Sequence, residues 1–387
     1  MRESQLNDPE NAAFSGIHST RNSRTTRSTQ PFDLGKQQTP EGQGVTPGPH
    51  AHPVVRFDSR CSPLVSGRVT PTKESQMRIA VTGGSGKLGR SVLTRLRADG
   101  HHVINFDRAG TRGQDFLNID LGNYGEVLDA FSGVNDLIDG FDAVVHLGAI
   151  PAPGLRPDAA TFHNNMNATY NVFQAARRSG IRRIVYASSE TVLGLPFDTD
   201  PPYLPVDEEY PARPESTYSL VKHLEEQMAI ELVRWDPLLS ITALRFSNVM
   251  DPEDYAAFPG FDADARSRKW NLWGYIDGRD GAQAVARALD AALPGFEAFI
   301  IAAADTVMSR PNAELAAEVF PQVAFARPVT AHETLLSIDK ARRLLGFAPE
   351  HSWRGPLAAA TPDAAPDGHA VPHPAAHPVP HPGKSRV

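Results

Sequence analysis

The sequence predicts an α/β protein with a doubly wound, parallel sheet that is covered by helices on both faces. Apolar, β-branched runs alternate with amphipathic helical stretches through the middle of the chain. Continuous apolar strands between helices are typical of a parallel sheet that is buried on both sides. The runs that we predict as strands are 77–81, 103–106, 143–145, 184–186, 241–246 and 299–301.

The first of these runs is followed directly by a helical pattern. Leu88, Val92, Leu93 and Leu96 recur at helical spacing, so they form one apolar stripe. We expect this stripe to face the sheet, because an amphipathic helix buries its apolar side. No internal repeat interrupts the alternation of strands and helices.

The two ends of the chain differ from its middle. Residues 1–76 are rich in Ser, Thr, Pro, Gly, Gln and Asn and lack an apolar period. Residues 358–387 are rich in Pro, His and Ala, and proline at this density prevents helices and strand ladders. Neither segment can bury enough apolar surface to offset its ordering entropy, so both are predicted to be disordered. The tail histidines lack a completing carboxylate or thiol, and no metal site is predicted.

Composition excludes several classes of partner. The chain has 387 residues, 41% of them hydrophobic, and a net charge of -7, which disfavours a nucleic-acid partner because phosphates require a basic face. No apolar run approaches the roughly 20 residues that span a bilayer. We therefore expect no membrane association. Cys61 is the single cysteine and cannot form an internal disulfide, so a cytoplasmic location is expected.

A glycine-rich turn joins the first predicted strand to the first helix. Its Gly-x-x-Gly-x-x-Gly spacing allows a tight turn, a close approach of the backbone to a pyrophosphate, and close packing of helix on strand. The helix N-terminus then offers free N–H groups to phosphates. A P-loop is excluded because the residues around Lys87 lack its pattern. The turn residues expected to bind a dinucleotide are Gly83, Ser85, Gly86, Lys87, Leu88 and Gly89.

An acidic residue ends the second predicted strand. Asp107 can accept hydrogen bonds from the ribose hydroxyls of an adenosine and would repel a 2′-phosphate. This predicts NAD rather than NADP as the cofactor. Arg108 leaves NADP open, because a neighbouring guanidinium can accommodate that phosphate.

A tyrosine and a lysine lie four residues apart in a predicted helix. This spacing places Tyr218 and Lys222 on one helical face. An ammonium close to a phenol lowers the pKa of the phenol, which makes it a better base. On this pair alone, an ordinary core tyrosine and a surface lysine are the better explanation of the pattern.

The order of the motifs resembles the extended short-chain dehydrogenase/reductase family, from residue 77 to about residue 356. The resemblance rests on the glycine turn, the Tyr218/Lys222 pair, and Asp120-Leu121, 146–149, Asn165, 188–194 and 244–249. It implies a Rossmann domain at 77–247 that binds NAD(P), and a substrate-binding lobe with returning Rossmann elements at 248–357.

The resemblance also implies residue roles. Ser189 would hydrogen-bond the substrate oxygen, Tyr218 would exchange its proton, and Lys222 would hold the nicotinamide ribose. Asn165 would either tie its helix to the sheet or take part in proton relay. The further residues implied at the cofactor are Asp120 and Leu121 at the adenine, with Leu147, Gly148 and Ala149 after the fourth strand.

Departures from the family's patterns narrow the reaction. The family's sugar-nucleotide dehydratases carry Thr-Asp-Glu where this chain has Ser189-Glu190-Thr191, which disfavours dehydration. The segment 252–273 is short for the nucleotide clamp of the epimerases, although Arg266, Arg268 and Lys269 could face an anion or form a solvated loop. Uronate dehydrogenases share the run Ala212-Arg213-Pro214.

We therefore expect an enzyme that transfers hydride between NAD(P) and a hydroxyl or carbonyl of a sugar-like substrate. The second interpretation is a nucleotide-sugar 4-epimerase with permanently bound NAD. The third is a non-catalytic dinucleotide sensor on the same fold. Members of the family commonly dimerise through the tyrosine-bearing helix and its neighbour, which favours a homodimer.

Overall fold

The computed structural model describes residues 76–111, 113, 115–133 and 139–355. The two segments predicted to be disordered, 1–76 and 358–387, lie outside these residues except for Gln76. Cys61 and the tail histidines also lie outside them. Within the described part of the chain, none of the helices combines the length and the apolar character that crossing a membrane requires.

A seven-stranded sheet forms the centre of the fold. All of its neighbouring strands pair in parallel, in the order β10-β7-β5-β4-β1-β2-β3. The order reverses between β1 and β4, which is where ligands bind in open α/β sheets. The strands are β1 (Arg78–Thr82), β2 (His102–Asp107), β3 (Phe116–Asn118), β4 (Ala143–His146), β5 (Arg183–Ser189), β7 (Ser240–Phe246) and β10 (Gly295–Ile301).

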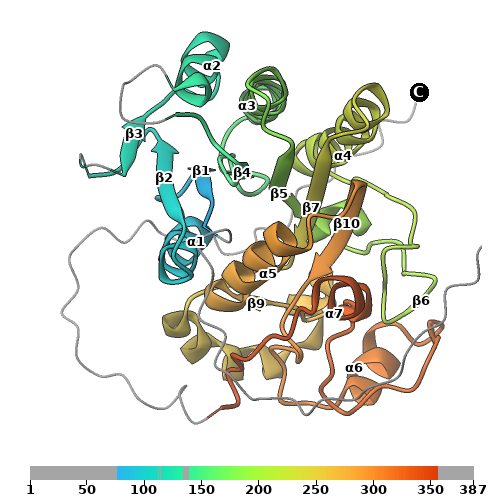
Figure 1. Cartoon of the computed structure of the whole chain (residues 1–387). Helices are drawn as coiled ribbons and strands as arrows, with labels where there is room; N and C mark the ends of the chain where they lie inside the picture. The colour runs from blue at the N-terminus through green and yellow to red at the C-terminus, as the bar shows by residue number, and fades with distance from the viewer. Residues whose placement is uncertain (1–75, 112, 114, 134–138, 356–387) are drawn as a thin grey trace, which may run out of the picture. The chain divides into compact units, whose positions relative to one another are not determined.

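Helices cover both faces of this sheet, as Figure 1 shows. Helix α1 (Lys87–Ala98) packs against α5 (Gly278–Ala291) on one face. On the other face, α3 (Asp158–Arg178) lies between α2 (Tyr124–Ser132) and α4 (Thr217–Trp235). The predicted doubly wound fold is confirmed.

Alternating side chains of the strands fill two separate cores. In β1, Ile79 and Val81 belong to the core under α1 and α5, whereas Ala80 belongs to the core under α2, α3 and α4. The same alternation separates Val145 from Val144 in β4. Since successive strand residues point to opposite faces, continuous apolar runs are what this two-sided burial requires.

Most of the predicted strand runs and the apolar stripe of α1 are confirmed. Val92, Leu93 and Leu96 are buried, and Leu88 is half-buried at the start of the helix. The edge strand β3 was not predicted from the sequence. It has only three residues, which are half-buried or exposed, so it lacks the apolar run that marks the central strands.

The remaining elements lie beyond the carboxyl ends of β5 and β7. Helix α7 (Asp339–Leu345) is capped by Gly346, whose φ of +66° lies in the left-handed region that glycine favours after a helix. The elements are η2 (Glu190–Leu193), β6 (Tyr203–Leu204), β8 (Val249–Met250), η3 (Pro252–Ala263), η4 (Ala265–Asn271), β9 (Ile276–Asp277), α6 (Asn312–Val319), β11 (Ala324–Phe325) and α7 (Asp339–Leu345). Strand β6 pairs with β11, and β8 pairs with β9.

Candidate active site

The glycine turn after β1 is packed as tightly as its spacing predicts. Gly83 has a φ of +72°, and a Cβ atom there would lie 2.6 Å from the backbone nitrogen of Gly148. A Cβ atom on Gly89 would lie 2.3 Å from the carbonyl oxygen of Gly83. Side chains at either position would therefore push the turn away from the loop after β4 or from the first turn of α1.

The N-terminus of α1 remains open toward the side on which a phosphate would lie. No side chain caps this helix, so N–H groups of its first turn are left for a ligand. A Cβ atom on Gly86 would meet only the carbonyl oxygen of Gly83, at 3.3 Å. Lys87 forms an ion pair with Asp254 of η3, which links this helix to the lobe. The turn thus fits a pyrophosphate.

Asp107 lies beside the glycine turn, where the sequence predicts the ribose site. One of its carboxylate oxygens accepts a hydrogen bond from the backbone amide of Ser85, at 3.0 Å. Arg108 forms an ion pair with Asp120, the acid expected near the adenine. The guanidinium is therefore engaged within the protein, so these contacts favour a ribose without a 2′-phosphate.

The loop after β4 forms the neighbouring wall of this site. A Cβ atom on Gly148 would lie 2.4 Å from the Leu121 side chain. Leu121, which the sequence analysis expects at the adenine, therefore packs against the loop after β4. Leu147 donates its backbone N–H to the Thr82 carbonyl, at 3.0 Å, and Ala149 follows Gly148.

Asn165 holds this loop in place. Its side chain accepts a hydrogen bond from the backbone N–H of Ile150 at 2.8 Å and donates one to the carbonyl of the same residue at 3.0 Å. Its Oδ1 atom also accepts a hydrogen bond from Asn164 at 2.9 Å. These contacts support the interpretation that Asn165 ties α3 to the sheet.

Ser189, Tyr218 and Lys222 come together at the carboxyl end of β5. Ser189 is the last residue of that strand, and Tyr218 and Lys222 lie one turn apart in α4. The Lys222 Nζ atom is 6.0 Å from the centre of the Tyr218 ring. All three side chains are buried. The structure therefore brings together the three residues that the sequence proposes as catalytic.

The surroundings of Tyr218 act on its pKa in opposite directions. Burial raises the pKa of its hydroxyl, while the ammonium of Lys222 and a hydrogen bond with Ser189 lower it. The acids Glu225 and Glu190 raise it further. The net pKa lies above the ordinary value, so the activating effect expected of Lys222 is present but does not dominate in the protein alone.

Lys222 has a buried carboxylate as its partner. Its Nζ atom donates to Glu225 Oε2 at 2.9 Å and to the carbonyl oxygen of Ala187 at 2.8 Å. Burial is the largest single effect and lowers the pKa of Lys222, but Glu225, Tyr218 and Glu226 together raise it above its ordinary value. The sequence analysis missed Glu225, although the three-residue spacing from Lys222 places both on one helical face.

A second buried acid, Glu190, follows Ser189. Burial raises the pKa of Glu190 to about 7. Its Oε1 atom accepts a hydrogen bond from Asn271 of η4 at 3.3 Å, so it joins β5 to the lobe. Sequence reasoning treated Glu190 only as a departure from the dehydratase pattern and missed this contact.

The expected basic cluster of the lobe is dispersed. Arg268 is buried between the rings of Phe261 and Trp270, with its guanidinium carbon 5.0 Å and 4.8 Å from the two ring centres. Arg266 donates to the carbonyl of Glu318 at 3.1 Å, and Lys269 pairs with an exposed acid at 3.7 Å. The three cations therefore do not face one common anion site.

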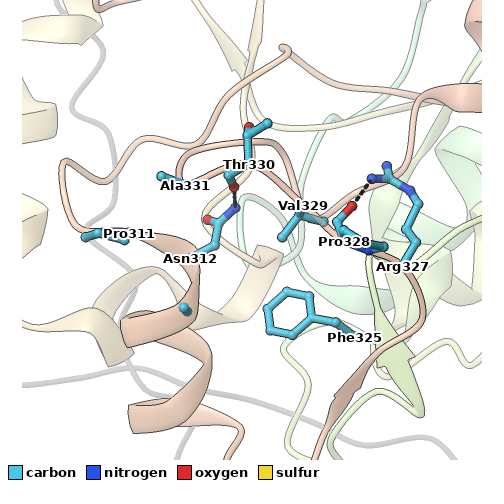
Figure 2. Close-up of a pocket in the computed structure, with 9 residues that line it drawn as sticks. Pro311, Asn312, Phe325, Arg327, Pro328, Val329, Thr330 and Ala331 are labelled. Carbon is cyan, nitrogen blue, oxygen red and sulfur yellow. Dashed lines mark hydrogen bonds between the residues drawn. The ribbon is translucent and has the colours of Figure 1, made fainter.

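A surface pocket lies elsewhere in the lobe. Residues 311–313, 325 and 327–331 line a cavity of about 380 Å³, in which Asn312 donates to the Thr330 carbonyl at 3.3 Å (Figure 2). None of the predicted catalytic or cofactor residues lines it. Among the described residues, His, Cys, Asp and Glu side chains form no group of three suited to a metal ion.

The fold and the site define a class of proteins with a doubly wound domain, an open glycine turn and a Ser/Tyr/Lys constellation. Residues 79–302 match the model of the NAD dependent epimerase/dehydratase family. The chain belongs to this family, which bears out the resemblance to extended short-chain enzymes and the expectation of an NAD-dependent enzyme.

Individual relatives have different activities in their names. A UDP-glucose 4-epimerase 2 from Oryza sativa subsp. japonica is 28% identical over 44% of this chain and 44% of the relative. The uronate dehydrogenase of Pseudomonas syringae pv. tomato is 30% identical over 39% of this chain and 52% of the relative. The chain thus spans about half the length of the curated relatives that it matches.

A solved structure extends the likeness to the fold. It is a short-chain dehydrogenase/reductase superfamily protein from Agrobacterium tumefaciens with bound NAD, 25% identical, with a TM-score of 0.54. The match covers 71% of this chain and 93% of that structure.

Proposed function

We propose that the chain is a dehydrogenase that oxidises a hydroxyl group of a small, sugar-like substrate with NAD. The observation that carries this proposal is the meeting of Ser189, Tyr218 and Lys222 at the carboxyl end of β5, on the same edge of the parallel sheet as the glycine turn after β1. A buried phenol, hydroxyl and ammonium at the carboxyl end of a parallel sheet form a set suited to proton exchange with a substrate oxygen.

The proposed cofactor site follows the walls described above. Asp107 would receive the ribose of the adenosine half, and the pairing of Arg108 with Asp120 favours NAD over NADP. Asn165 would act by holding the loop after β4. The other residues proposed to contact NAD are Gly83, Ser85, Gly86, Lys87, Leu88, Gly89, Asp120, Leu121, Leu147, Gly148 and Ala149, with Tyr218 and Lys222 at the nicotinamide end.

Each catalytic side chain has a distinct role. When bound, NAD accepts the hydride from the substrate carbon. Tyr218, in its phenolate form, would take the proton of the substrate hydroxyl and become the neutral phenol, and Ser189 would donate a hydrogen bond to the same oxygen. Lys222 uses two of its three N–H donors within the protein, which leaves one for a ribose hydroxyl of the nicotinamide half.

A nucleotide-sugar 4-epimerase is the second candidate, because relatives with that name match the chain. The dispersed cations of η4 favour the dehydrogenase. A diphosphate needs convergent positive charge, whereas Arg266 and Arg268 are engaged with other parts of the lobe.

The expected partner for oligomerisation is a second copy of the chain. Helices α3 and α4 expose Tyr170 and Leu220 at their surface, where such a copy could pack.

The test is a panel of uronates, aldoses and nucleotide sugars, each offered with NAD or NADP while nicotinamide absorbance is followed. A dehydrogenase accumulates NADH in solution. An epimerase instead converts a nucleotide sugar without net reduction, and a dinucleotide sensor binds NAD and turns over nothing.

Two variants test the assigned residues. Tyr218→Phe is expected to lower turnover by roughly 100-fold or more, because it removes the group that exchanges the proton. Tyr203→Phe is the control, since its hydroxyl bonds Asp207 at 2.7 Å and does not belong to the constellation. Equal activities of the two variants would remove Tyr218 from the mechanism.

A further inference from the structure

A buried carboxylate lies behind the catalytic lysine. Glu225 is on α4, three residues after Lys222, and its Oε2 atom accepts a hydrogen bond from Lys222 Nζ at 2.9 Å. Its other oxygen, Oε1, accepts a hydrogen bond from the hydroxyl of Thr169 on α3 at 2.8 Å. The Glu225 side chain is fully buried. Both of its oxygens are thus committed, one to the lysine and one to the neighbouring helix.

The hydrogen bonds continue from Thr169 to Thr82, the last residue of β1, and to the loop after β4. His146, at the end of β4, lies between two hydroxyls, with Nε2 3.0 Å from Thr169 and Nδ1 2.7 Å from Thr82. The Thr82 hydroxyl in turn accepts the backbone N–H of Gly148 at 3.3 Å. Burial and the charge of Lys222 lower the pKa of His146 to about 3, so the imidazole is neutral.

The two ends of this chain of hydrogen bonds determine the direction of every link. The Gly148 amide can only donate, and the Glu225 carboxylate can only accept. Thr82 must therefore donate to His146 Nδ1, and His146 must carry its proton on Nε2 and donate it to Thr169. Each hydroxyl then donates toward Glu225. A directed chain of hydrogen bonds therefore leads from Gly148, in the loop after β4, to Glu225, the partner of Lys222.

We propose that Glu225 is a positioning residue, which holds the ammonium of Lys222 beside Tyr218 and ends a directed hydrogen-bond chain from the cofactor loop. This inference rests on the proposed function only in taking Tyr218 and Lys222 as the reacting pair. Two observations support it independently of pKa: both Glu225 oxygens have partners, and the chain from Gly148 has no other acceptor at its end.

The charge of Glu225 has a measurable consequence for Tyr218. A negative charge close to a phenol raises its pKa. In Glu225→Gln an amide oxygen can still accept from Lys222, so the ammonium stays beside Tyr218 while the charge is removed, and deprotonation of the phenol becomes easier. A unit charge in a partly buried site is worth about one pKa unit or more. Other titratable or polar groups surround Tyr218, Lys222 and Glu225. They are Glu226 on α4, Glu190 on η2, neutral His146 on β4, and Ser189 and Tyr186 on β5.

Glu226 provides a matched control for Glu225. It is the next residue of α4 and is also buried, but its carboxylate pairs with Arg245 at 2.8 Å and 3.0 Å and accepts the hydroxyl of Ser188 at 2.6 Å. It does not contact Lys222. Replacing each glutamate by glutamine removes one buried charge from the same helix, and only one of the two replacements alters the partner of the lysine.

The experiment titrates the Tyr218 phenol by stopped-flow pH jumps, with tyrosinate absorbance read before alkaline unfolding. Each protein is compared with its own Tyr218→Phe form. Glu225→Gln is expected to lower the Tyr218 pKa by about one unit, Glu226→Gln by less than half of that, and Glu225→Asp to restore most of the wild-type value. Equal shifts in the two glutamine variants, or no shift in either, would overturn the proposal.

A second measurement uses the wild-type protein and does not depend on the folding of any variant. Nitrogen NMR of labelled histidines, with the His146 signal assigned from a His146→Asn spectrum, reports the ring tautomer. The directed chain requires the proton on Nε2, and a proton on Nδ1 contradicts it. Neither measurement needs a substrate, so failure of every sugar in the panel would reject the proposed function without deciding this inference.

Discussion

The carboxylate of Asp107 accepts a hydrogen bond from the backbone amide of Ser85, at 3.0 Å. The bond joins the end of β2 to the glycine turn, so the acid has a fixed position next to the proposed phosphate site. A carboxylate held there places a negative charge where the adenosine ribose of a dinucleotide would lie.

Removing this charge should change the choice of cofactor. Asp107→Asn keeps an oxygen that can accept from Ser85 but no longer repels a 2′-phosphate. We expect the ratio of the NADP affinity to the NAD affinity to rise about tenfold, which corresponds to ~1.4 kcal/mol. Calorimetric titration with both dinucleotides measures the ratio. Asp99→Asn, at the far end of α1, should leave it unchanged, and an unchanged ratio in Asp107→Asn would contradict the assigned role.

Two glycines of the turn should respond differently to alanine. In Gly86→Ala the new methyl group meets only the Gly83 carbonyl, at 3.3 Å, but occupies the space left for phosphate. We expect stability close to wild type and NAD affinity lowered about tenfold or more. In Gly89→Ala the methyl group lies 2.3 Å from the Gly83 carbonyl, and overpacking should cost about 2 kcal/mol or more.

Thermal unfolding and NAD titration distinguish these outcomes. Gly125→Ala is the control, because its methyl group would approach no atom closer than Asn123 Oδ1 at 3.4 Å. If Gly86→Ala bound NAD as tightly as wild type, the phosphates would not lie against this turn.

The buried acid Glu190 should make stability depend on pH. Its pKa rises from 4.5 to about 7 on folding, mainly because of burial, so the folded state binds the proton more tightly than the unfolded state. The contribution of protonated Glu190 to the free energy of unfolding is complete below pH 4.5 and is lost as the pH rises toward 7. The loss amounts to at most about 3 kcal/mol.

Denaturant unfolding of wild type and Glu190→Gln between pH 4.5 and 7 tests whether stability falls with rising pH because of Glu190. The glutamine variant should gain stability relative to wild type as the pH rises from 4.5 to 7, and the difference should then level off. Glu253→Gln, at an exposed position of η3, should show a constant difference from wild type. A Glu190→Gln variant that loses stability relative to wild type as the pH rises from 4.5 to 7 would refute the assignment.

Local sequence patterns predicted the features that depend on neighbouring residues. Helical spacing alone places Tyr218 and Lys222 on one face, and glycine spacing alone predicts the tight turn that Gly83 and Gly89 form. The central strands were predictable because burial on both faces requires continuous apolar runs. The short edge strand β3 was not, since its partly exposed residues carry no such pattern.

The sequence by itself thus determined the doubly wound fold, the glycine turn and the identity of the three candidate catalytic residues. Only the tertiary structure decided what surrounds them: that Glu225 partners Lys222, that burial outweighs the ammonium at Tyr218, and that Arg268 is enclosed by aromatic rings. The physical reason is that periodicity reports which face of an element is buried. Hydrogen bonds and charges depend on which elements meet, and here Glu225 on α4 meets Thr169 on α3, 56 residues earlier in the chain.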